Sequence, residues 1–304
     1  MTLSPVSSGS ERVKLRVRVP ATVANLGPGF DSMALAVDVW NEVLLDTEGP
    51  PGVTVEGEGA GELPEDASNL VMRSIAHLAG VGEGGLPPFT LACTNRIPLE
   101  RGLGSSASAV VAGLLLADRL LGTDRARSRP DWLLRFAVEL EGHADNVAAA
   151  LYGGIVLAYQ GAEEWQVEPL RPNESLRPVL LVPEGERIST AQARKSLPEQ
   201  VPLQAAVFNT SRAALLVLAL TLRPDRLGEA LWDNLHQEHR LALAPRSHEL
   251  FTSLRESGVP VCVAGSGPSL LAFETESVAV PDPGKGWRVI RTTITSGAAL
   301  SEER

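Results

Sequence analysis

The segment that most constrains the fold of this chain is a glycine- and serine-rich run at Arg101–Ser108. It joins an apolar strand pattern at 89–97 to a helical pattern from Ser105 to about Leu121. A helix start leaves about four backbone N–H groups without partners and carries a partial positive charge. Glycine lets the backbone turn inward and approach an anion closely. The run therefore predicts either a phosphate-binding loop or an ordinary tight turn followed by a capped helix.

The patterns on either side of this run predict an α+β fold. Strands and helices occur in separate runs and do not alternate regularly, which disfavours a doubly wound sheet. Period-two or continuous apolar stretches predict strands, and apolar residues spaced by three and four predict helices. The expected strands are 14–20, 37–47, 53–58, 89–97, 154–159, 177–182, 259–264, 269–273 and 287–293, and the expected helices are 69–79, 105–121, 189–197, 203–222 and 247–256, with a further helix after Pro130.

A change in texture near 161–171, where prolines cluster, predicts a domain boundary. We expect a flexible tail at 1–12, an N-terminal domain at 13–165 and a C-terminal domain at 166–304. The tail is rich in serine and lacks the apolar core of a signal peptide, so secretion is not expected. The longest apolar stretch, 213–220, is too short to span a membrane and is expected to be a buried helix.

Charge and cysteine content narrow the class of protein. The 304 residues include 27 Lys and Arg against 37 Asp and Glu, and the net charge of −10 argues against a nucleic-acid-binding surface. The only cysteines are Cys93 and Cys262, so neither a disulfide framework nor a thiolate zinc cluster is expected. A protein of the reducing cytoplasm is the default expectation.

Two further glycine-rich segments place polar or flexible backbone between apolar stretches. Asn25 and Asp31 lie on a loop that reads Asn-Leu-Gly-Pro-Gly-Phe-Asp. They could bind an ammonium or hydroxyl group, or form turns that only shape the loop. The segment Val263–Ser269 holds Gly265 and Gly267 between two apolar strands. It could approach a ligand closely or form a plain hairpin.

An acidic run at Glu139–Asn146 straddles an expected helix break at Gly142. One glutamate, either Glu139 or Glu141, could bind Mg²⁺, which takes one or two carboxylates together with phosphate oxygens. The polar residues after the break could face a small polar substrate; the alternative is a solvated helix end. These residues are His143, Asp145 and Asn146.

Arginines in the second half of the chain could bind a carboxylate. Thr190 and Arg194 are one helical turn apart, and Arg240 follows His236 at the same spacing. An arginine fork matches a carboxylate in a bidentate manner. The alternative for each is an ordinary solvated side chain.

Together and in this order, these segments resemble the GHMP kinases and, within them, the homoserine kinase branch. The resemblance spans roughly 16–273. Residues 98–107 resemble the ATP-binding loop of the whole superfamily, whereas the loop at 20–31 and the segment 141–147 resemble the homoserine kinase branch. This chain has Ala149 where that branch usually has proline.

The resemblance implies a two-domain architecture and an activity. The N-terminal domain would hold a mixed or antiparallel sheet with helices and the ATP loop, and the C-terminal domain a ferredoxin-like α/β sandwich. The activity would be ATP-dependent phosphorylation of the side-chain hydroxyl of L-homoserine, with Mg²⁺, in threonine biosynthesis. Such enzymes are cytoplasmic, bind neither nucleic acid nor membrane, and are often homodimers. The alternatives are another small-alcohol kinase, of the mevalonate or diphosphocytidyl-methylerythritol type, or a non-catalytic nucleotide sensor.

The resemblance also implies roles for individual residues. Asn69 would contact adenine, and Ser106 and Glu141 would hold Mg²⁺, with Ser105 as the alternative to Ser106. Asn146, Glu141 and Arg194 would serve the transfer step, without a clear catalytic base. The remaining ATP-binding positions would be Pro98, Leu99, Glu100, Arg101, Gly102, Leu103, Gly104, Ser105, Ser106, Ala107 and Ser108. Homoserine would be surrounded by Asn25, Asp31, His143, Asp145, Thr190, Arg194 and Arg240, with the arginines on its carboxylate and Asp31 near its ammonium group.

Overall fold

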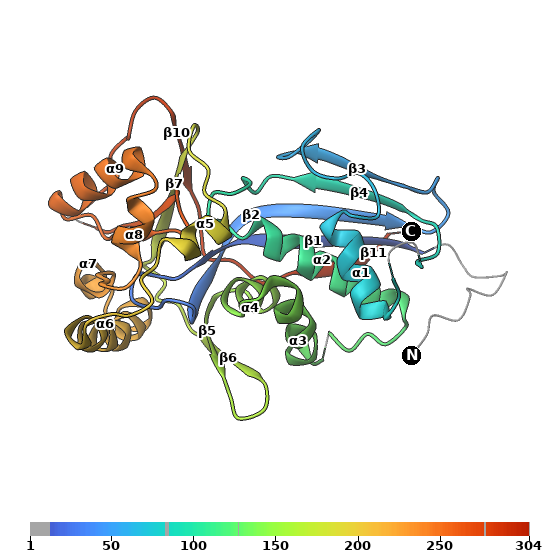
Figure 1. Ribbon diagram of the computed structural model, residues 1–304, viewed down its shortest axis with the longest axis horizontal. Helices are drawn as coiled ribbons and strands as arrows, with labels where there is room; N and C mark the ends of the chain where they lie inside the picture. The colour runs from blue at the N-terminus through green and yellow to red at the C-terminus, as the bar shows by residue number, and fades with distance from the viewer. Residues whose placement is uncertain (1–12, 83–84, 127, 277, 304) are drawn as a thin grey trace.

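The chain folds around two β-sheets, as a computed structural model shows (Figure 1). The structure describes residues 13–82, 85–126, 128–276 and 278–303. The expected tail at 1–12 lies outside the described residues. The first strand, β1, begins at Lys14, close to where the tail was expected to end.

The first sheet is mixed and has seven strands. Its main path runs β11-β1-β2-β4-β3, with β3 and β4 parallel and the other neighbours antiparallel. The hairpin of β5 and β6 joins this sheet through β5, which pairs with the N-terminal end of β2 at residues 33–35. This end of β2 precedes the β-bulge in its pairing with β1. The strands are β1 (Lys14–Ala24), β2 (Met33–Asp46), β3 (Gly52–Gly57), β4 (Thr90–Asn95), β5 (Ile155–Gln160), β6 (Trp165–Leu170) and β11 (Ala299–Glu302).

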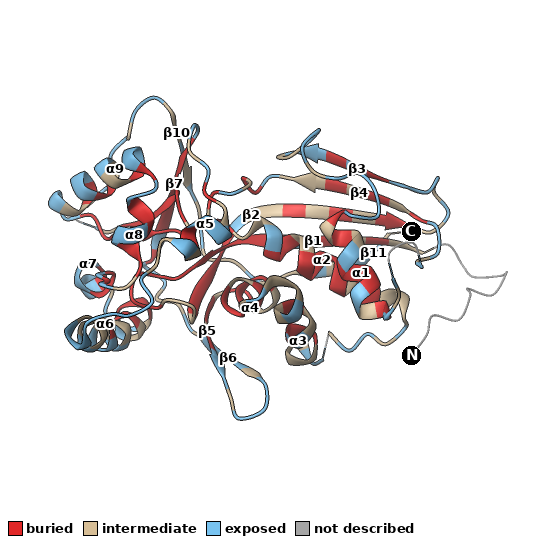
Figure 2. Ribbon diagram, in the orientation of Figure 1, coloured by how far each residue is buried: buried red, intermediate tan, exposed pale blue. Residues whose placement is uncertain are grey.

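Four helices pack around the first sheet and bury its main core (Figures 1 and 2). They are α1 (Leu70–Ala79), α2 (Ser105–Leu120), α3 (Pro130–Glu141) and α4 (Asp145–Tyr152). The helices α2 and α4 contact β1 directly, and α1 and α3 pack on α2. The small residues of α2 and α4 allow this close packing, and side chains such as Val110 and Ala148 are fully buried. This arrangement fixes the first turn of α2 against the end of β1.

The second sheet is antiparallel, in the order β10-β7-β9-β8, and has helices on both faces. Alternate residues of β7 (Arg177–Pro183) enter different clusters: Leu180 packs with α6 (Leu203–Thr221) and α7 (Leu227–Ala230), and Leu181 packs with α8 (Gln237–Leu241) and α9 (Pro245–Glu256). A strand buried on both faces has a continuous apolar sequence, as β7 and β9 do. The other elements are α5 (Thr190–Lys195), η1 (Pro224–Arg226), β8 (Val261–Val263), β9 (Leu270–Glu274) and β10 (Trp287–Arg291).

The α+β class expected from the sequence is confirmed, together with the mixed first sheet. Two strands add to the first sheet at or beyond the expected boundary: β6, which begins at Trp165 and crosses it, and β11. The chain therefore returns to that sheet at its end, and the division at 165/166 stays a prediction, as does the ferredoxin-like description of the second half.

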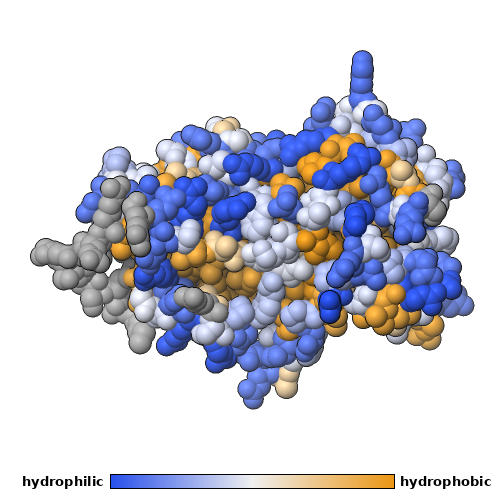
Figure 3. All heavy atoms as spheres, turned by 180° about the vertical axis from the view of Figure 1, so that it is seen from behind, coloured by the Kyte–Doolittle hydropathy of each residue, from blue (hydrophilic) through white to orange (hydrophobic). Residues whose placement is uncertain are grey.

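The expectation that 213–220 is a buried helix holds for one face of this stretch only, because Leu218 is 39% exposed. Only one face of α6 packs on the second sheet, with Leu216, Ala219 and Leu220 buried. The opposite face is open: Leu203 is 80% exposed and Val207 is 61% exposed. Figure 3 shows apolar side chains gathered at the lower right, the side where α6 lies. By length and composition alone α6 is long and apolar enough to cross a membrane. Only 22% of its apolar window is buried within the protein, in agreement with its open face.

Candidate active site

Residues from both halves of the chain line one cavity of about 220 Å³. A second cavity, of about 320 Å³, has a largely apolar lining that includes Val43, Leu63 and Leu99. Both cavities are lined by Glu100, Ser105 and Ser106, so they adjoin at the first turn of α2. A ligand with an apolar ring system and a charged tail could therefore occupy both.

The first turn of α2 has backbone donors available for a ligand. Gly104 is the N-cap residue, with φ +70°, and no side chain caps the helix. Among the described residues, no backbone N–H of residues 102–107 donates to a protein acceptor, and the first such bond runs from Ser108 N to Gly104 O. The serines thus do not cap the helix, and the partial positive charge of its start faces the cavities.

Close packing explains the glycines in this loop. A Cβ at Gly104 would lie 1.9 Å from Thr22 Oγ1, and one at Gly102 would lie 2.0 Å from the Ala264 carbonyl oxygen. Gly265 also packs closely on Gly102, since a Cβ at Gly265 would lie 2.6 Å from the Gly102 carbonyl oxygen. The segment Val263–Ser269 does connect the antiparallel strands β8 and β9, and it also packs against the α2 loop.

Several loop side chains stabilise the fold, although Arg101, which lines the smaller cavity, has a buried Nη1 without a hydrogen-bond partner among the described residues. Arg101 donates from Nε to the Pro183 carbonyl oxygen (2.9 Å) and from Nη2 to that of Glu184 (3.0 Å). Leu103 and Ala107 are buried apolar residues. Ser108 is buried as well; its hydroxyl donates to the Ser105 carbonyl oxygen (2.8 Å) and accepts from Asn41 Nδ2 (2.9 Å).

Asn69 lines the larger cavity but uses its side chain within the fold. It is the N-cap residue of α1, where its Oδ1 accepts from Val71 N at 2.9 Å. Its Nδ2 donates to the Pro64 carbonyl oxygen at 2.8 Å. Its side-chain oxygen and one amide hydrogen are therefore already engaged, and Asn69 shapes this end of the cavity.

The two glutamates of the acidic run have different neighbours. Glu141 accepts a hydrogen bond from Ser106 Oγ at 2.7 Å, whereas Glu139 pairs with His77 Nε2 on α1 at 2.9 Å. Gly142, with φ +82°, ends α3 directly after Glu141. Burial raises the pKa of the Glu141 carboxyl, and the Ser106 hydrogen bond partly offsets this.

The donor set at Ser106 and Glu141 fits Mg²⁺. Among the described residues, no group of three or more His, Cys, Asp or Glu side chains could hold a metal ion. Mg²⁺ does not need one, because it binds through one or two protein oxygens and completes its shell with phosphate oxygens and water. The Ser106 hydroxyl and the Glu141 carboxylate, whose oxygens lie 2.7 Å apart beside the open amides of α2, can supply these protein oxygens.

Asn146 lines the smaller cavity and is oriented by Thr22. The Thr22 hydroxyl donates to Asn146 Oδ1 at 2.7 Å, and Thr22 is fully buried at the end of β1. The Asn146 NH₂ group is therefore the part of the amide left for a ligand. The neighbouring Asp145 is also buried, and burial raises its pKa to about 6.

Asp31 and Arg194 form a bidentate ion pair across the cavity, with distances of 2.7 and 3.1 Å. Asp31 N also donates to Asn25 Oδ1 at 2.9 Å, and both residues have positive φ. The turn that shapes the loop is thus present, and the Asp31 carboxylate still faces the cavity. Thr190 and Arg194 lie on the same helix α5, and Thr190 is exposed.

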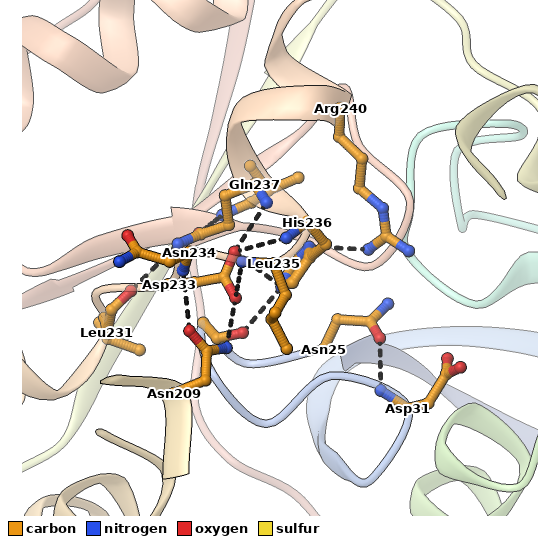
Figure 4. A network of polar contacts seen from close by, with 12 residues as sticks. Asn25, Asp31, Asn209, Leu231, Asp233, Asn234, Leu235, His236, Gln237 and Arg240 are labelled. Carbon is orange, nitrogen blue, oxygen red and sulfur yellow. Dashed lines mark hydrogen bonds and ion pairs between the residues drawn. The ribbon is translucent and has the colours of Figure 1, made fainter. Parts of the chain in front are cut away.

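Arg240 is buried and reaches the cavity from α8 (Figure 4). Its Nη1 donates to the Gly265 carbonyl oxygen at 2.6 Å and lies 3.2 Å from His236 Nδ1. Burial lowers its pKa to about 10, so the guanidinium remains charged at neutral pH. The pKa of His143 is lowered by burial and by the nearby Arg194.

Comparison with known proteins identifies the family. Residues 69–154 match the family model described as GHMP kinases N terminal domain. A homoserine kinase from Clavibacter michiganensis is 45% identical over 266 residues, which is 86% of this chain and 83% of that protein. The chain belongs to the homoserine kinases. A second relative, homoserine kinase from Streptomyces avermitilis, is 39% identical over 94% of each chain.

Solved structures agree with this homoserine kinase assignment. The crystal structure of homoserine kinase from Cytophaga hutchinsonii matches with a TM-score of 0.78 and 29% identity, over 98% of this chain and all of the other. A crystal structure of L. major mevalonate kinase matches with a TM-score of 0.65 at 16% identity, over 98% of this chain and all of the other, which shows a shared fold alone.

Within this homoserine kinase, the smaller cavity brings together all seven residues that the sequence singled out for the substrate, and several of those singled out for ATP. Asn69 and Ser108 line the larger cavity instead. The sequence analysis gave no role to Thr22, although it lies within the recognised loop at 20–31. It noted His236 only for its spacing from Arg240 and did not predict its bridging contacts. It also missed Ile188 and Ser189 in the cavity wall.

Proposed function

We propose that this chain transfers the γ-phosphoryl group of ATP to the side-chain hydroxyl of L-homoserine and forms O-phospho-L-homoserine. The observation that carries the proposal is a single cavity in which open helix amides face a carboxylate and two arginines. The amides suit a phosphate, and the charged set suits a zwitterionic amino acid.

ATP would lie across both cavities. Its adenine would enter the larger, apolar cavity near Asn69, and its triphosphate would follow residues 98–108 to the first turn of α2. Ser106 and Glu141 would hold Mg²⁺, which neutralises phosphate charge when bound. The Ser106–Glu141 hydrogen bond supports this pairing, and the His77 contact of Glu139 disfavours the alternative glutamate.

Homoserine would bind between Asp31 and the arginines Arg194 and Arg240. The Asp31–Arg194 pair supports this pose because the two charges already lie in contact. A zwitterion inserted between them would give Asp31 an ammonium group and Arg194 a carboxylate in exchange. The surrounding polar residues would be Asn25, His143, Asp145 and Thr190.

The transfer step would rest on positioning and charge neutralisation, as phosphoryl transfer generally does. Asn146 would donate its NH₂ group beside the homoserine hydroxyl, since its oxygen is held by Thr22. An amide donor cannot take up the hydroxyl proton, so this proton would pass to an oxygen of the transferring phosphoryl group or to water as the new O–P bond forms. Arg194 and the α2 amides would stabilise negative charge on the transferring group.

Transfer of labelled γ-phosphate from ATP tests the proposal. Labelled phosphohomoserine should form from L-homoserine, with far less product from L-threonine or mevalonate. Preferred phosphorylation of mevalonate or of diphosphocytidyl-methylerythritol would favour another small-alcohol kinase. ATP binding without ADP formation on any of these alcohols would favour a nucleotide sensor.

We further propose a homodimer in the cytoplasm, without a membrane-bound state. The exposed apolar face of α6 supports an interface between copies, since Leu203, Val207 and Leu222 are each more than half exposed. Sedimentation equilibrium should give twice the chain mass, and Val207→Asp should reduce it. A monomer at micromolar concentration would contradict the dimer.

A further inference from the structure

The imidazole of His236 bridges two parts of the proposed homoserine site that are far apart in sequence. Its Nε2 lies 2.7 Å from the Gly27 carbonyl oxygen, in the loop that carries Asn25 and Asp31. Its Nδ1 lies 3.2 Å from Arg240 Nη1. The ring is 1% exposed and stacks on Phe30 with 5.1 Å between centroids.

The partners of the ring fix its tautomer. A carbonyl oxygen only accepts, so Nε2 carries the hydrogen, and a guanidinium only donates, so Nδ1 presents its lone pair. Burial lowers the pKa of His236, which keeps the ring neutral at pH 7. Only the neutral form with hydrogen on Nε2 satisfies both contacts.

A buried carboxylate holds the backbone that presents this ring (Figure 4). Asp233 Oδ2 accepts from the backbone N–H of His236 and of Gln237, each at 2.8 Å. Asp233 Oδ1 accepts from Asn209 Nδ2 at 2.7 Å, which ties the start of α8 to α6. The position of His236 is therefore set by α6 and α8 together.

The same contacts leave one edge of Arg240 available. Its Nη1 uses its hydrogens on His236 and on the Gly265 carbonyl oxygen. Its Nε is buried without a hydrogen-bond partner. The hydrogen bonds of Arg240 to described residues all come from Nη1, which leaves Nη2 without one. An Nε–Nη2 edge is a fork that matches the two oxygens of a carboxylate.

We propose that His236 is a positioning residue that orients Arg240 toward the carboxylate of the amino-acid substrate and fixes the Gly27 loop beside it. This inference rests on the proposed function. His236 touches neither substrate nor ATP in this account, and it acts through Arg240 and Gly27.

The test compares His236→Phe with His239→Phe on the same helix. Phenylalanine keeps the ring stacked on Phe30 and removes both hydrogen bonds, while His239 is exposed and serves as the matched control. Loss of an acceptor for a charged donor should raise the homoserine KM about tenfold or more. The KM for ATP should stay within about twofold, since no α2 amide is touched. The His239 variant should match the wild type.

A double-mutant cycle separates positioning from a general structural effect. If His236 acts through Arg240, then His236→Phe should add little to the homoserine KM of Arg240→Met. Additive effects, or an unchanged KM in the single variant, would overturn the inference. Should His236→Phe fail to fold, ¹⁵N chemical shifts of the wild-type ring decide: a hydrogen on Nε2 agrees, and one on Nδ1 refutes it. Absence of homoserine phosphorylation by the wild type would instead refute the proposed function.

Discussion

Removal of the Thr22 hydroxyl tests how the reacting end of the site is built. Thr22→Val keeps the side chain's shape but leaves Asn146 Oδ1 without the donor that lies 2.7 Å away. An unsatisfied buried acceptor costs about 1–3 kcal/mol. Because Asn146 lines the cavity, water there can partly satisfy its oxygen, which places this case near the lower end. We therefore expect a loss of about 1 kcal/mol in the free energy of unfolding.

The effect on turnover should be larger than the effect on either KM. Without the Thr22 hydroxyl, the Asn146 amide can rotate and present its oxygen to the substrate. The NH₂ donor at the reacting centre is then lost. Loss of about 1.4 kcal/mol of transition-state stabilisation lowers kcat about tenfold. Coupled ADP release measures this, and Thr22→Ser, which keeps the hydroxyl, should retain most of the activity. Normal kcat in Thr22→Val would refute the orienting role.

The remaining predictions concern the charged residues. Glu141→Gln should lower kcat at least a hundredfold and leave the melting temperature nearly unchanged, whereas Glu139→Gln should be active; a fully active Glu141→Gln would exclude the metal role. Arg194→Ala should raise the homoserine KM by about 10–100-fold, the cost of a charged hydrogen bond. Its stability should change by less than about 1 kcal/mol, because the pair with Asp31 is partly exposed; Lys195→Ala is the control, and an unchanged KM would reject the contact. The raised pKa of Asp145, about 6, means that the folded state binds a proton more tightly than the unfolded state, so the free energy of unfolding should fall as pH rises from about 4 to 6, by up to about 3 kcal/mol. Urea titrations of Asp145→Asn should lack this decrease, and equal slopes in both proteins would contradict it.

Local signals placed most elements of the fold. Gly104 and Pro130 mark the beginnings of α2 and α3, and Gly142 marks the end of α3, because these residues have strong backbone preferences. The elements that escaped prediction are short or paired over long distances. The strand β11 has four residues and pairs with β1 at the other end of the chain, so its own sequence gives no strand signal.

The site was predictable where motif residues carry the chemistry, and not where contacts between distant residues decide it. Glu139 and Glu141 lie two residues apart on α3, hence on opposite faces, and only the packing of α1 and α2 shows which one meets Ser106. Thr22 meets Asn146 across 124 residues, and His236 meets Gly27 across 209. Neither contact has a signature in local sequence.

A structure of the protein with L-homoserine and a non-hydrolysable ATP analogue is the most direct test of the whole account. We expect phosphate oxygens on the backbone N–H groups of residues 102–107, with the amino-acid carboxylate on Arg194 and Arg240 and its hydroxyl beside Asn146. A nucleotide bound elsewhere, with those N–H groups still facing water, would contradict it.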